Sequence, residues 1–138
     1  MSQQPPHGIS REGLDATFEA EEARKSNLLL AAQLLRDQKQ EEAAAKFAQA
    51  AAIEERLSDI CAAKGLTEKA ALHRFSAASC WAQAGNFYRA IELCDDLLAR
   101  ADLPDRLRQS VQHYGDTLRL RRAQWYAELE LETMGSRG

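Results

Sequence analysis

The chain has 138 residues, of which 45% are hydrophobic and 28% are charged, and its formal net charge is −3. This length suits one domain with a core of its own, and so small a net charge argues against a nucleic-acid-binding protein with a basic surface throughout. Abundant Ala, Leu, Glu, Arg and Gln with few β-branched residues favour helices over strands, so we expect an all-α protein.

A short tail and a long first helix are predicted at the N-terminus. Residues 1–10 are expected to be disordered because they contain Gln-Gln-Pro-Pro-His-Gly. Apolar residues then recur at helical spacing from Leu14 to Leu35, and Ser10 is a candidate N-cap. Because charged residues interrupt this stripe between residues 21 and 25, we expect the first half of the helix to project past the core.

Four further helices are predicted downstream, separated by short turns. A polar break at residues 37–40 precedes the second helix, which ends at Gly65, a residue that tolerates positive φ. Thr67 is a candidate cap for the third helix, residues 84–86 form the next turn, and Pro104 begins the fifth helix. Because the links are short, sequential helices are expected to pack antiparallel, as stacked hairpins or a bundle.

Two of the predicted hairpins share a pattern of small and large residues. The second hairpin resembles a tetratricopeptide repeat (TPR) in the spacing of six residues: Trp81, Gly85, Phe87, Ala90, Cys94 and Leu97. The first hairpin has four residues at the same offsets, without the turn glycine: Leu34, Ala43, Phe47 and Ala50. The fifth helix resembles the start of a third unit. Ala43 and Ala90 are expected at helix crossings, where a small side chain lets two backbones approach.

The resemblance is degenerate. Ala43 and Ala90 are 47 positions apart, whereas the family repeats about every 34 residues. We therefore expect a single TPR-like domain of about two and a half units over residues 11–132, with residues 133–138 frayed. Another α-helical bundle, such as the three-helix MIT arrangement, is the alternative.

If the hairpins stack as in that family, the resemblance implies a concave groove that binds a partner protein. The groove offsets carried over from the family include nine residues that we predict to bind the partner: Lys25, Leu28, Arg36, Phe75, Ser79, Gln83, Gln112, Asp116 and Arg119. The family's clamp for a C-terminal carboxylate is missing, so the groove suits an amphipathic helix or an extended peptide.

Charge is segregated between the two ends of the chain. Residues 11–22 carry five acids and one base, whereas residues 106–122 carry five arginines and one aspartate. The basic segment, with Arg119 and Arg122, is either a solvated face or a surface that receives an acidic partner segment. Nucleic acid is a weaker candidate because few aromatic residues are interleaved. Alternatively, the acidic first helix pairs with the basic fifth helix of another copy, which would make the protein a structural homo-oligomer.

No residue pattern predicts catalysis, a metal site or a cofactor. The three histidines are not at metal-ligand spacing, and no glycine-rich phosphate loop is present. Adjacent acids such as Glu54 and Glu55 diverge by about 100° on a helix, so we expect them to be solvated. The cysteines lack a CxxC pair and are expected in the core. No apolar run approaches the roughly 20 residues that cross a bilayer. We therefore predict a cytoplasmic, non-enzymatic adaptor or scaffold, with a helical enzyme as a minor alternative.

Overall fold

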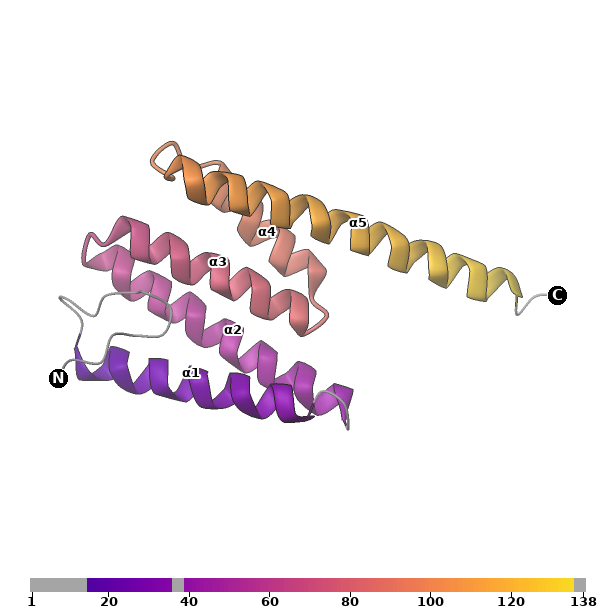
Figure 1. Ribbon diagram of the computed structural model, residues 1–138, viewed down its shortest axis with the longest axis horizontal. Helices are drawn as coiled ribbons and strands as arrows, with labels where there is room; N and C mark the ends of the chain where they lie inside the picture. The colour runs from indigo at the N-terminus through magenta and orange to yellow at the C-terminus, as the bar shows by residue number, and fades with distance from the viewer. Residues whose placement is uncertain (1–14, 36–38, 136–138) are drawn as a thin grey trace.

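The computed structural model describes residues 15–35 and 39–135. These residues form α1 (Ala16–Leu35), α2 (Gln40–Ala63), α3 (Thr67–Gln83), α4 (Phe87–Leu98) and α5 (Asp105–Gly135). No strand occurs within the two described ranges, and the predicted all-α class is confirmed. Each helix packs against the next one along the chain (Figure 1), as expected for helices joined by short links. The predicted N-terminal tail and the Ser10 cap lie outside the described residues.

The turns after α2 and α3 depend on two glycines. Gly65 and Gly85 have φ values of 75° and 85°, in the left-handed region that favours glycine. In both turns the amide after the glycine donates to the carbonyl five residues earlier, at 2.9 and 2.8 Å. Asn86 then caps α4 by accepting a hydrogen bond from the Arg89 amide at 3.0 Å. The predicted cap of α3 is wrong, because Thr67 is the first helical residue and the preceding residue makes no side-chain capping bond.

The first half of α1 packs onto α2 and does not project past the core. Its start is capped by Asp15, whose carboxylate accepts a hydrogen bond from the Phe18 amide at 3.0 Å. The Phe18 side chain is fully buried in a cluster with Leu57 of α2. The expectation of a projecting half-helix is wrong because two of the charged residues that interrupt the apolar stripe, Glu22 and Lys25, are themselves buried.

Small residues line the contacts between helices. Ala43 and Ala90, which were predicted at helix crossings, are both buried, and so are seven further alanines: Ala32, Ala50, Ala51, Ala70, Ala71, Ala77 and Ala78. Short side chains let helix backbones approach closely. The buried apolar residues form one cluster among α1, α2 and α3, a small one between α2 and α3, and one that joins α3, α4 and α5.

α5 extends well beyond the other helices. Its first half is held in the core by Val111 and Leu118, which are fully buried. In the second half of α5, every side chain from Ala123 to Met134 is exposed. Figure 1 shows this projecting half of the helix extending away from the body. Residues 133–135, which were expected to fray, belong to the helix. None of the helices in the described part of the chain is both long and apolar enough to cross a membrane.

Candidate functional site

The residues predicted to line a partner-binding groove do not form one open surface. Lys25 is only 3% exposed, so the prediction that it lines the groove is wrong. Leu28 is half-buried and packs against the cluster among α1, α2 and α3. Gln83 is exposed at the end of α3, and Arg36 lies outside the described residues. The α1 side of the predicted groove is therefore largely internal.

Phe75 and Ser79 of α3 contact α5. The rings of Phe75 and Tyr114 meet edge to face, with centroids 5.6 Å apart and an interplanar angle of 80°. Burial raises the pKa of the Tyr114 phenol, and a side-chain hydrogen bond with Ser79 acts in the opposite direction. Both α3 residues are half-buried. They join neighbouring helices and present only part of their surface to a partner.

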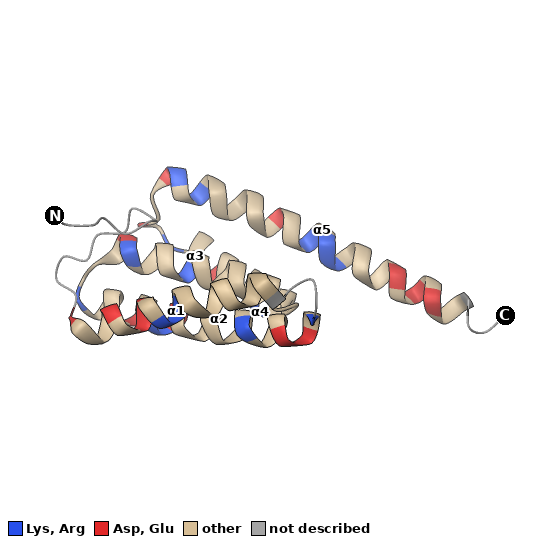
Figure 2. Cartoon of the chain, turned by 60° about the horizontal axis from the view of Figure 1, so that its bottom comes forward, with Lys and Arg blue, Asp and Glu red and all other residues tan. Residues whose placement is uncertain are grey.

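The remaining predicted residues lie along α5, and two of them, Arg119 and Arg122, lie beside α4. Gln112 donates to Asp116 at 3.1 Å, and Arg119 forms ion pairs with Asp116 and with Asp95 of α4. Arg119 and Arg122 line a shallow hollow together with five residues of α4: Tyr88, Ile91, Glu92, Asp95 and Asp96. Figure 2 shows basic residues in the middle of α5 and acidic residues toward its C-terminal end. The predicted basic surface is thus partly neutralised by the chain's own carboxylates.

Two of the charged residues that interrupt the stripe of α1 belong to a buried polar cluster, which is formed by Glu22, Lys25, Glu54 and His73. Lys25 Nζ lies 3.4 Å from a carboxylate oxygen of Glu22 and 3.4 Å from one of Glu54. The same Glu54 oxygen lies 3.0 Å from His73 Nδ1, and the His73 ring meets Phe18 edge to face. All four side chains are buried. The carboxylate of Glu54 on α2 therefore contacts polar side chains of both α1 and α3.

The prediction that Glu54 and Glu55 are solvated is wrong. Glu54 belongs to the buried polar cluster, and Glu55 accepts a hydrogen bond from Trp81 Nε1 at 2.7 Å. Glu55 also pairs with Arg89 of α4, and this hydrogen bond raises the pKa of the guanidinium. The two carboxylates diverge as expected for neighbours on a helix, but each of them meets partners on other helices.

The spacing of α1 contained a signal for this cluster. Phe18, Glu22, Lys25, Leu29 and Ala32 follow one another at intervals of four, three, four and three residues. This spacing places the two charged residues on the same helix face as the three apolar ones. A charged residue inside an apolar stripe predicts a buried partner, because a lone buried charge is costly.

The cysteines are confirmed as core residues, and all three are free thiols. Burial raises the pKa of Cys80 to about 12 and that of Cys94 to about 11. Burial also raises the pKa of Cys61. The thiolate is the nucleophilic form of cysteine, so these side chains are poor nucleophiles in the folded protein.

We expect iodoacetamide at about pH 8 to alkylate the native chain far more slowly than the unfolded chain. For Cys80 and Cys94 the pKa in the folded protein exceeds the ordinary thiol value of 9.0. Their contribution to stability is therefore fully present below about pH 9 and is lost as the pH rises toward 11–12. Mass spectrometry with and without denaturant counts the alkylated sites. Equal alkylation rates in the two states would contradict the burial of these thiols.

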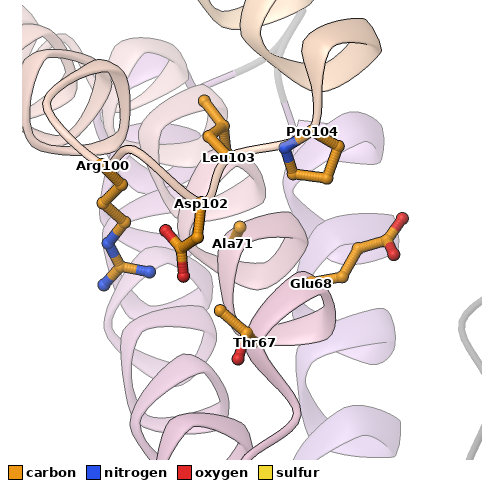
Figure 3. A pocket seen from close by; sticks show the side chains of 7 residues that line it. All are labelled: Thr67, Glu68, Ala71, Arg100, Asp102, Leu103 and Pro104. Carbon is orange, nitrogen blue, oxygen red and sulfur yellow. The ribbon is translucent and has the colours of Figure 1, made fainter.

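A small cavity lies between the start of α3 and the connection from α4 to α5. It measures about 240 Å³, and Figure 3 shows the seven residues that line it: Thr67, Glu68, Ala71, Arg100, Asp102, Leu103 and Pro104. Leu103 and Pro104 give it an apolar side, while Arg100 and Asp102 lie together on its rim. In the described part of the chain, no three His, Cys, Asp or Glu side chains gather as metal ligands would.

The projecting half of α5 concentrates exposed apolar side chains. Six of the nine large hydrophobic residues that are exposed in the described ranges lie on α5, and all but Leu120 are on the projecting half: Leu120, Trp125, Tyr126, Leu129, Leu131 and Met134. Tyr126, Leu129 and Met134 also line a hollow on the helix with Glu130 and Thr133. Comparison of the chain with protein-family models, with curated proteins and with solved structures found no match.

Proposed function

We propose that the protein is a non-enzymatic protein-interaction module, an adaptor or scaffold built from TPR-like hairpins and acting in the cytoplasm. The projecting half of α5 supports this proposal most directly, because it presents Trp125, Tyr126 and Leu129 to solvent. Aromatic residues are enriched in protein interfaces, and contiguous exposed apolar surface marks interaction sites. A partner protein is the occupant that this composition favours.

The energetics of an isolated helix support the same proposal. A helical segment of roughly 12 residues is marginal in water without tertiary contacts. From Ala123 to Met134 every side chain is exposed, so the body supports this segment only from its N-terminal end. A partner that covers one face would remove apolar surface from water, at roughly 25 cal/mol per Å².

The position of Trp125 defines the face that a partner protein would cover. Trp125 and Leu129 continue the helix stripe of Leu118, which is buried against the body. The partner would therefore lie beside the start of α4 and extend the packing that α4 provides for the first half of α5. Arg122, which is half-buried beside α4, lies next to this face. Its guanidinium group could therefore pair with an acidic residue of the partner.

A photo-crosslinking experiment tests the proposal. With p-benzoylphenylalanine in place of Trp125, irradiation of cells that produce the protein is expected to give protein adducts that mass spectrometry identifies. The matched control places the same amino acid at Leu34, which is 71% exposed on α1. We expect adducts at position 125 to exceed those at position 34 by roughly tenfold, because interface residues are held against the partner. Equal or absent adducts at the two positions would overturn the proposal.

A further inference from the structure

α5 has a second exposed apolar face besides the one that contains Trp125. The partner of this second face can be specified. We propose that a second copy of this chain pairs antiparallel with the C-terminal part of α5, residues 119–134, through a stripe that faces away from α4. The inference rests on the proposed interaction function and names one partner for it. The stripe consists of Leu120, Gln124, Ala127, Leu131 and Met134.

This stripe is on the side of α5 opposite to the body. Leu118 is fully buried, whereas Leu120, two residues later, is 61% exposed. Two residues correspond to about 200° around a helix, so Leu120 points away from the core. Leu131 and Met134 follow on the same side and are 69% and 70% exposed. The body therefore leaves this face free along its whole length.

The spacing of the stripe is that of a coiled-coil seam. Its members follow at intervals of four, three, four and three residues, the repeat that keeps apolar residues in contact with a partner helix. With Leu120 of one copy opposite Leu131 of the other, Gln124 lies opposite Ala127. This register is symmetric, because the second copy makes the same contacts in reverse, as a two-fold dimer requires.

Charge order selects the antiparallel orientation. The segment begins with Arg119, Arg121 and Arg122 and continues with Glu128, Glu130 and Glu132, as the blue and red stretches of α5 show in Figure 2. Antiparallel pairing places the basic block of each copy opposite the acidic block of the other. Parallel pairing would place arginine beside arginine and glutamate beside glutamate, which is repulsive.

One ion pair follows from the register. Arg121 and Glu128 are seven residues apart and lie on the same flank of the stripe. In an antiparallel dimer identical flanks meet, so Arg121 of each copy lies within side-chain reach of Glu128 of the other. Both residues are exposed. The same pair therefore forms twice in each dimer.

The acidic segment of α1 is a weaker partner for α5. Glu21 already pairs with Arg56 of α2 at 3.1 Å, and Glu22 is in the buried polar cluster. Pairing between α1 and α5 of two copies was the homo-oligomer considered from the sequence. Because these acidic residues of α1 already have partners within their own chain, pairing between the α5 helices of two copies is favoured instead.

Analytical ultracentrifugation of the full chain over a range of concentrations tests this pairing. The stripe is only about 22 Å long, so we expect a weak dimer, with a Kd in the range of tens of micromolar that rises with salt. Arg121→Glu or Glu128→Arg alone is expected to weaken the dimer by about tenfold or more, because each creates two like-charge contacts. An equimolar mixture of the two variants is expected to restore it.

The double variant Arg121→Glu/Glu128→Arg is the matched control, because it keeps the net charge and rebuilds both ion pairs in the antiparallel arrangement. It is expected to dimerise like the wild type, and circular dichroism checks that every variant is folded. A wild-type chain that stays monomeric at several hundred micromolar, or a double variant that fails to dimerise, would overturn the pairing. The adducts at Trp125 come from the opposite face, so the proposed function stands or fails separately from this result.

Discussion

Replacement of Glu54 by alanine is expected to lower the free energy of unfolding by about 3–5 kcal/mol, the usual cost of removing one partner of a buried ion pair. Lys25 would lose a carboxylate oxygen at 3.4 Å while its ammonium group stays buried. His73 would lose the partner of its Nδ1 atom, and its Nε2 atom is already buried without a partner among the described residues. Urea denaturation followed by circular dichroism measures the change.

A carboxylate at the surface of the same helix provides the control. Glu42 pairs with Lys39 at 3.3 Å, and both side chains are more than half exposed. Glu42→Ala is expected to change stability by less than about 1 kcal/mol, as is usual for exposed pairs. Equal losses for the two variants would mean that the buried polar cluster does not hold α1 and α3 against α2.

The helices could be predicted because their signals are local. Apolar residues at helical spacing mark each element, and two turns contain a glycine with positive φ, Gly65 and Gly85. The error in α1 came from treating Glu22 and Lys25 as solvated. Whether a charged residue faces solvent or a buried partner depends on helices far along the chain, and Glu54 and His73 supply those partners only after the three helices have packed.

The candidate site was harder to predict because it depends on how α5 packs. The resemblance assigned Phe75 and Ser79 to an open groove, but Tyr114 of α5 packs against Phe75. Arg119 was expected to meet a partner, and it pairs with Asp95 of α4. The spacing along α5 did indicate that apolar residues occupy two opposite faces of this helix. Leu118 and Leu120 are about 200° apart, and the first is buried while the second is exposed.

Replacement of Phe18 by alanine tests whether the first half of α1 belongs to the core. The ring is fully buried and meets His73 edge to face, with centroids 5.4 Å apart. Truncation of a buried phenylalanine typically costs about 3–5 kcal/mol, because apolar contacts are lost and a cavity remains. We expect a loss in this range, measured by thermal or urea denaturation.

Leu34 provides the control on the same helix, since it is 71% exposed and its truncation is expected to change stability by less than about 0.5 kcal/mol. Amide hydrogen exchange adds a local readout. If Phe18 and the buried polar cluster hold α1 onto α2, Phe18→Ala will speed exchange throughout α1 more than in α4. A loss below about 1 kcal/mol with unchanged exchange would show that the start of α1 projects into solvent, as its charged residues first suggested.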